Sequence, residues 1–163
     1  MKALCLSAVV ALLSLAPAFA DDGPPQYGTP IDLETARKVI AGAQANAKQE
    51  KWPVAIAIVD TAGFLVAFER LDNTQLASVQ IALEKAQTSA LFRRPTRAFE
   101  DRLAEGGGNL KLLRLPGGLP MEGGLPILVD GKVIGAIGVS GVTSVQDGII
   151  AQAGLDALAG QKD

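Results

Sequence analysis

Four side chains between residues 81 and 92 have the types and spacing of a binding site. They are Ile81, Lys85, Thr88 and Phe92. Their separations of four, three and four positions place them along one face of a predicted helix. A lysine and a hydroxyl between two apolar side chains suit an anionic ligand with an apolar body. The alternative is that Lys85 lies at the edge of the core with its ammonium in water. Arg70, at the end of a predicted strand, is either a second cation for the ligand or a solvated residue.

Other kinds of chemistry lack the residues they need. The chain has no histidine and one cysteine, Cys5, so zinc ligation and a histidine base are both excluded. Ser140 lies in a segment that resembles a nucleophile elbow, but position 142, where that pattern has glycine, is a valine. The carboxylates favour hard cations, but their spacing is not that of an EF-hand. The sequence therefore shows no catalytic constellation and no metal site of its own.

Glycine recurs at every third position in Gly135, Gly138 and Gly141. A dinucleotide-binding loop has its glycines in the turn between a strand and a helix, whereas the first two of these lie inside a predicted strand. One face of that strand carries mostly small side chains, so a helix, another backbone or a flat ligand can approach it closely. We include Gly138 and Ser140 among the candidate ligand contacts for this reason.

The first twenty residues have the features of a secretion signal. Lys2 is basic, the following residues up to about Pro17 are mostly apolar, and Ala18-Phe19-Ala20 fits the small-x-small cleavage pattern. The apolar run is too short to span a bilayer. We predict cleavage after Ala20 and a secreted or periplasmic protein with no membrane insertion afterwards. An uncleaved anchor is the alternative.

Cleavage would leave 143 of the 163 residues, enough for one domain with a core of its own. The net charge of −2 and the lack of a basic run argue against nucleic acid as a partner. Residues 21–31, rich in Pro, Gly and Asp, are predicted as a flexible lead-in, and residues 32–160 as the domain.

Periodicity predicts an α+β domain with a five-stranded antiparallel sheet. The predicted helices cover residues 33–50, 76–92, 97–105 and 145–159, and the strands cover 54–60, 64–70, a short stretch within 110–121, and the two arms of a hairpin within 123–141. Asp130-Gly131 is a strong hairpin-turn signal. Asp32, Thr96 and Ser144 are the predicted N-caps, with Asp147 completing a weak capping box.

Five segments, spread over about residues 33–158, resemble one known family. They are Val59-Asp60-x-x-Gly63-x-Leu65-Val66-Ala67-Phe68-x-Arg70, Lys85-Ala86-x-Thr88, Gly123-Gly124-Leu125-Pro126-Ile127, Gly135-Ala136-Ile137-Gly138-Val139-Ser140-Gly141, and Asp147 with Ala151-x-Ala153-Gly154. On these segments the chain resembles the GlcG/HbpS-like haem-binding family, which is related to the C-terminal domain of PduO-type cobalamin adenosyltransferases. It departs from the family pattern at Gly148, where a glutamate often stands, and in having no histidine.

The resemblance implies a profilin-like three-layer α/β/α fold with a five-stranded antiparallel sheet, assembled into homo-oligomers. It also implies haem as a possible cofactor. Without histidine, ligation of haem iron by imidazole is impossible. Met121 and Tyr27 carry other axial ligand types, and we note Met121 as the candidate iron ligand, although it is otherwise an apolar side chain beside a turn.

Three functions remain open. The first is a non-enzymatic periplasmic binding protein for haem or a related tetrapyrrole, with Lys85 and Arg70 paired to the propionates. The second is an enzyme, or an enzyme accessory, acting on a small carboxylate such as a 2-hydroxy acid, with Lys85 as the anion anchor. The third is an interaction subunit whose assembly is its function. The first is our prediction.

Overall fold

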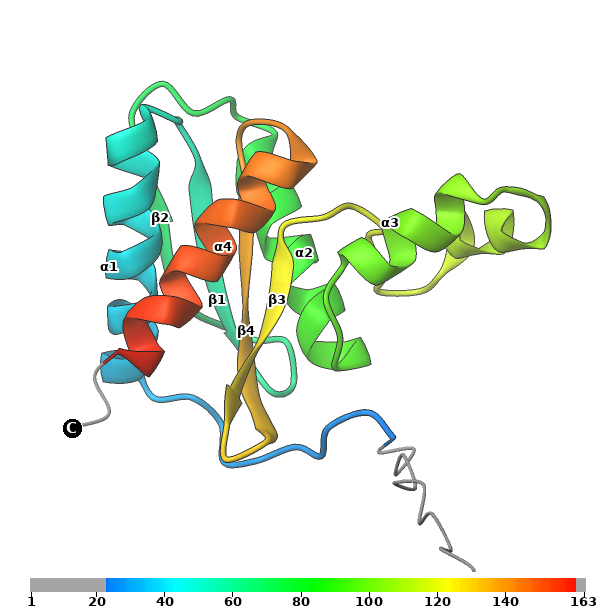
Figure 1. Cartoon of the computed structure of the whole chain (residues 1–163), viewed down its shortest axis with the longest axis horizontal. Coiled ribbons are helices and arrows are strands. Elements are labelled where there is room, and N and C mark those ends of the chain that lie inside the picture. Colours follow the sequence, from blue (N-terminus) through cyan, green and yellow to red (C-terminus); the bar gives the residue numbers. More distant parts are fainter. Residues whose placement is uncertain (1–22, 161–163) are drawn as a thin grey trace, which may run out of the picture.

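A four-stranded antiparallel sheet with helices on both faces organises the chain (Figure 1). The computed structural model describes residues 23–160; the predicted signal segment 1–20 and its cleavage site lie outside them. The elements are α1 (Leu33–Glu50), β1 (Ala55–Asp60), β2 (Leu65–Arg70), α2 (Ser78–Phe92), α3 (Arg97–Ala104), the 3₁₀ helix η1 (Gly107–Arg114), β3 (Gly124–Val129), β4 (Lys132–Ser140) and α4 (Ser144–Ala159). Within residues 23–160, no helix is both long and apolar enough to cross a membrane.

The sheet has the strand order β2-β1-β4-β3, so the predicted fifth strand is wrong. The segment expected to contain it forms η1 and an irregular return to β3. Two physical features prevent an extended strand there. Gly117, within this segment, adopts a positive φ angle, and the backbone N–H of Leu119 donates to the hydroxyl of Thr88 instead of to a neighbouring strand.

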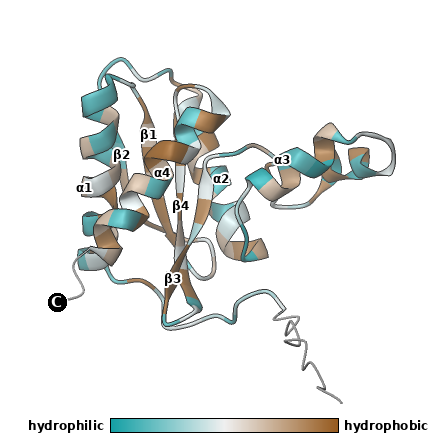
Figure 2. Cartoon of the chain, viewed as in Figure 1, coloured by the Kyte–Doolittle hydropathy of each residue, from teal (hydrophilic) through white to brown (hydrophobic). Residues whose placement is uncertain are grey.

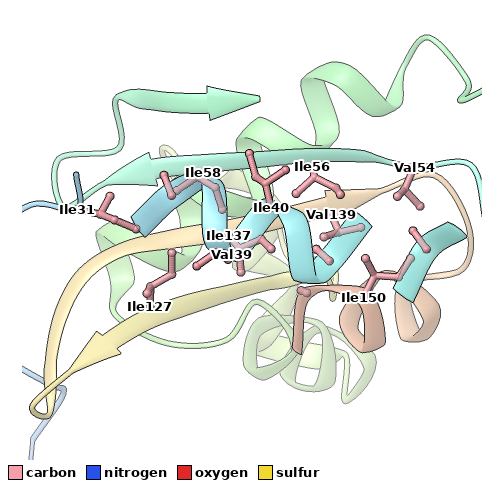
Figure 3. Packing of buried hydrophobic residues seen from close by; sticks show 14 residues of the cluster. Ile31, Val39, Ile40, Val54, Ile56, Ile58, Ile127, Ile137, Val139 and Ile150 are labelled. Carbon is pink, nitrogen blue, oxygen red and sulfur yellow. The ribbon is translucent and has the colours of Figure 1, made fainter. Parts of the chain in front are cut away.

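The main core lies between one face of the sheet and the pair α1 and α4. Figure 3 shows isoleucine and valine side chains of the strands, with Ile31 and Ile127 at one end, pointing toward α1. The predicted large-residue face of β4 contributes Ile137 and Val139, both fully buried. The alternation of large side chains along the central strands is therefore the direct cause of this layer.

The second layer is α2, which packs on the opposite face through alanines. Its Ala82, Ala86 and Ala90 are fully buried against the small-residue face of β1 and β4. A Cβ atom added to Gly138 would lie 2.1 Å from the carbonyl oxygen of Ala82. Glycine is therefore required for this helix to approach β4 so closely. In Figure 2 the sheet lies between α1 and α4 on one side and α2 on the other.

Local signals place most helix ends and the hairpin as predicted. The carboxylate of Asp32 caps α1 by accepting from the N–H of Thr35 at 2.7 Å. Asp130 and Gly131 have φ angles of 49° and 71°, both positive as a type I′ turn requires. The predicted cap of α4 is wrong: its N-cap is Thr143, not Ser144.

Two segments lie outside these layers. Residues 23–31, predicted as a flexible lead-in, contact the hairpin, where Tyr27 forms a parallel bridge with Val133. Residues 97–115, comprising α3 and η1, form an arm that projects from the body in Figure 1. Thr96 makes no side-chain cap for α3; its hydroxyl accepts from the N–H of Gly124 at 2.9 Å and ties the base of the arm to β3.

Candidate functional site

Lys85 and Asp147 form a buried ion pair that joins α2 to α4. The Lys85 ammonium donates to Asp147 Oδ2 at 2.7 Å and to the backbone carbonyl of Val139 at 3.1 Å. The second carboxylate oxygen accepts from the N–H of Val142 at 3.2 Å. The side chains are only 1% and 3% exposed. Lys85 therefore has its charge satisfied within the protein, and a role as anion anchor would require this pair to separate.

Burial dominates the electrostatics of Asp147. Desolvation raises the pKa of its carboxyl above the ordinary 3.8, and the Lys85 ammonium and the backbone N–H donors offset only part of that rise. The way α4 is capped explains why the Asp147 carboxylate can pair with Lys85. Thr143 and Gln146 form the capping box of α4, so Asp147 is not needed for capping, contrary to the prediction, and points into the core instead.

Glycine at position 123 makes room for this pair. Gly123 has a φ of +124°, and a Cβ atom there would lie 2.9 Å from Lys85 Nζ and 2.7 Å from the carbonyl oxygen of Val139. A side chain at this position would collide with the pair and strain the backbone. Close packing against the ion pair therefore explains why the motif Gly123-Gly124-Leu125-Pro126 begins with glycine.

The remaining predicted residues on α2 are also engaged. The hydroxyl of Thr88 donates to the carbonyl of Glu84 at 2.7 Å and accepts from the N–H of Leu119 at 2.8 Å. The ring of Phe92 packs edge-on against Phe99, with centroids 5.3 Å apart. Ile81 is half-buried. In this arrangement the face holds the arm and its return segment against α2.

The predicted strand residues differ in their surroundings. Arg70 is exposed at the end of the edge strand β2. Gly138 lies under α2, and the buried hydroxyl of Ser140 donates to that of Ser78 at 3.2 Å. Gly138 and Ser140 therefore act in the contact between α2 and the sheet. Arg70 lies in the same row as Ser140, across β1, but is exposed.

The structure also separates the two candidate iron ligands. Met121 is 38% exposed in the return segment before β3. The Tyr27 hydroxyl donates toward the carbonyls of Ala90 and Leu91 at 3.1 and 3.0 Å, and the Arg93 guanidinium lies over its ring, 5.2 Å from the centroid. Tyr27 thus fixes the N-terminal segment to the end of α2. In the part of the chain that the structure describes, no three potential metal-ligating side chains form a cluster.

A cavity of about 640 Å³ opens elsewhere, among the start of α1, the end of α4 and the β3–β4 hairpin. Its wall is largely apolar and includes Ile31, Pro126, Ile127, Leu128, Ile134, Leu155 and Leu158. Its polar side chains are Thr29, Asp32, Thr35, Lys38, Gln152 and Asp156. A mostly apolar hollow of this volume with a few polar groups is typical of a small-molecule site.

None of the predicted site residues lines this cavity. Its wall comes from four separate chain segments. The sequence of each segment alone indicates only a helix end or a strand. The available signal was the pair Leu155 and Leu158, apolar positions in the last turns of a helix. A second, smaller cavity of about 320 Å³ does include Thr88, together with Gln80, Glu84, Gln87 and residues 117–119.

Comparison with known proteins places the chain in a family. The model of the family described as haem degrading protein HbpS-like matches residues 31–156. The chain belongs to this HbpS-like family. Protein GlcG of Escherichia coli K12 is 39% identical over 110 residues, 68% of this chain and 81% of GlcG. An uncharacterized 15.0 kDa protein of Citrobacter freundii is 35% identical over 130 residues, 78% of this chain and 92% of that protein.

Solved structures agree with the predicted family and fold. A double mutant of Streptomyces reticuli HbpS superimposes with a TM-score of 0.74 at 31% identity, covering 88% of this chain and 97% of HbpS. The PduOC:heme complex gives a TM-score of 0.72 at 27% identity, covering 79% and 95%. The predicted family and the profilin-like α+β fold with an antiparallel sheet are thereby confirmed, apart from the number of strands.

Proposed function

We propose that this HbpS-like protein binds haem or a related tetrapyrrole in the 640 Å³ cavity, without catalysing a reaction. The observation that carries this proposal is the cavity itself, an apolar hollow of ligand size in a chain whose fold matches that of a relative in complex with haem. The relative in complex with haem supports the ligand class, and the size and apolar lining of the cavity support the proposed location.

The cavity residues fit the macrocycle better than they fit its iron. Leu128, Leu155 and Leu158 offer apolar contacts to a flat hydrocarbon ring. The chain has no histidine, and both Met121 and Tyr27 lie outside the lining. When bound, haem would supply an iron centre, and the polar side chains of this lining would offer it mainly oxygen atoms, since the Lys38 ammonium pairs with Glu34. We expect affinity to come mainly from apolar burial.

The α2 face is the weaker location. A haem propionate reaching Lys85 would have to displace a carboxylate at 2.7 Å in a buried setting, and removing one partner from such a pair leaves an uncompensated charge. The same fact weakens the small-carboxylate hypothesis, because Lys85 was its anion anchor.

Export completes the proposal. The apolar run and Ala18-Phe19-Ala20 motif in residues 1–20 support delivery to the periplasm or the medium, and we propose that the protein acts there as a homo-oligomer.

Hemin titration followed by Soret absorbance tests the ligand and its location. Wild type should show a saturable change in Soret absorbance. Leu128 lines the cavity and is 47% exposed, so Leu128→Glu places a carboxylate on the apolar wall and should weaken binding roughly tenfold. Leu76→Glu is the matched control, since Leu76 is 77% exposed and outside the cavity.

Two outcomes would overturn the proposal. No saturable Soret change in wild type would exclude haem as the ligand. Weakened binding in Ile81→Glu, with Leu128→Glu unchanged, would move the site to α2.

The non-enzymatic part has its own test. With ascorbate present, the Soret band of the bound haem should decay no faster than that of free hemin. Faster decay would make the protein haem-degrading and overturn that part.

A further inference from the structure

The arm carries two exposed rows of side chains that differ in chemistry. In a 3₁₀ helix, residues three positions apart lie over one another, so η1 sorts its side chains into three rows. Leu110 and Leu113, 55% and 63% exposed, form an apolar row. Lys111 and Arg114 form an exposed basic row beside it. The third row, which includes Leu112, is half-buried.

Neither exposed row has a partner within residues 23–160. No hydrogen bond or ion pair joins the side chain of Lys111 or Arg114 to another described residue, and η1 packs mainly against α3. Figure 1 shows the arm projecting from the body, with its end directed away from α1 and α4. A protruding element with adjacent leucines is an unusual surface for a protein that acts alone.

The cavity has one cationic side chain in its lining, whereas η1 of the arm carries two. Asp32 and Asp156 contribute carboxylates to its lining, and Lys38 is its one cation. Lys38 is already paired with Glu34 at 2.9 Å. A tetrapyrrole dicarboxylate held there would face two carboxylates and a single lysine, which also pairs with Glu34. The arm of the same chain leaves the body away from the cavity (Figure 1), so any further cation has to come from elsewhere.

We propose that the arm of a second copy of this chain docks at the mouth of the cavity. Leu110 and Leu113 would cover the exposed apolar wall at Leu128, and Lys111 and Arg114 would face the acidic rim and the carboxylates of the ligand. The ligand part of this inference rests on the proposed function, whereas the docking part does not. Because arm and cavity are different surfaces, two copies either exchange arms across a two-fold axis or dock head to tail, in which case the contacts close into a ring if the rotation permits.

Cysteine cross-linking tests the docking without any ligand. In a Cys5→Ser background, which removes the chain's only cysteine, Leu113→Cys and Leu128→Cys are made as separate proteins, mixed and treated with a short bis-maleimide. A cross-linked dimer containing one of each is expected. The control mixture replaces Leu128→Cys with Leu76→Cys, which is more exposed but outside the cavity. Cross-linking no greater than in the control, or mainly between two Leu113→Cys chains, would overturn the proposal.

Charge reversal tests the contact with ligand. Lys111→Glu/Arg114→Glu should weaken hemin affinity roughly tenfold, because a charge-assisted contact is lost at the mouth. Lys48→Glu/Lys51→Glu, two exposed positions at the end of α1, is the matched control. Unchanged affinity in the arm variant would overturn the ligand contact.

The two proposals fail in different ways. Absence of hemin binding in wild type would refute the proposed function while leaving the cross-linking result to decide the docking.

Discussion

Lys85 and Asp147 are 62 residues apart in the chain, yet their charged atoms lie 2.7 Å apart in the core. The pair joins α2, on one face of the sheet, to the first turn of α4, and its ammonium also contacts β4 through the carbonyl of Val139. All three layers of the domain therefore meet at this buried ion pair: α2, the sheet, and the layer formed by α1 and α4.

Breaking the pair on one side should be costly. Lys85→Met leaves a buried carboxylate, and Asp147→Leu leaves a buried ammonium, so each should lower the free energy of unfolding by about 3–5 kcal/mol. The double variant removes both charges and should lose much less than the sum of the two. Urea unfolding of the four proteins measures this coupling. Simple additivity would show that the two side chains do not depend on each other.

The cost of losing Lys85 should depend on pH. Burial raises the pKa of Asp147 above 3.8, so the folded state binds this proton more readily than the unfolded chain does. The free energy of unfolding therefore falls as pH rises above the pKa that Asp147 has in the unfolded chain. In Lys85→Met the carboxylate has no cation and its pKa rises further.

The difference in unfolding free energy between wild type and Lys85→Met should thus be small near about pH 4 and grow toward about pH 7. Urea unfolding across this range measures it. A difference that is constant, or greatest in acid, would contradict the assignment of Asp147 as the partner.

Close packing of α2 on β4 gives a third prediction. A methyl group at Gly138 would lie 2.1 Å from the carbonyl oxygen of Ala82, so Gly138→Ala must shift the helix and should cost about 1–3 kcal/mol. Gly108→Ala is the control, because no atom lies within 4 Å of a Cβ there. Thermal unfolding compares the two. Equal stability would mean that α2 can move away from the strand freely.

Local signals were sufficient where the structure depends on local geometry. The cap at Asp32 and the turn at Asp130-Gly131 act within a few residues, so the sequence predicts them correctly. The partner of Lys85 is different, because burial and pairing across 62 positions arise only when the layers assemble. The strand expected within residues 110–121 does not form. Gly117 has a positive φ angle, and the backbone N–H of Leu119 donates to a side chain instead of to a neighbouring strand.

The cavity could not be predicted from the sequence, for a related reason. Its wall combines Ile31, Pro126, Ile134 and Leu155, each from a different part of the chain. Hydrophobic periodicity indicates which face of an element is apolar, but not whether neighbouring elements leave a space between their ends. The candidate face on α2 had the right residue types, but its polar groups already have partners. Lys85 pairs with Asp147, and Thr88 bonds to the return segment at Leu119.

Export gives a fourth prediction. The protein recovered from the periplasm of a Gram-negative host should begin at Asp21, because small residues at positions 18 and 20 match the cleavage pattern. Ala20→Phe places a large side chain at the small position and should retain the leader. Intact mass distinguishes the two species. A wild-type mass that includes residues 1–20 would refute the cleavage site and the proposed location.

The last prediction concerns the iron of a bound haem. With no histidine in the chain, the Soret and visible bands should lack the pattern of bis-histidine ligation. Met121 and the Tyr27 hydroxyl lie outside the cavity lining, and that hydroxyl is directed to the carbonyls of Ala90 and Leu91. Met121→Ala and Tyr27→Phe should therefore leave the band positions of the hemin complex unchanged. A shift in either variant, with an unchanged circular dichroism spectrum, would place the iron beside that residue and away from the cavity.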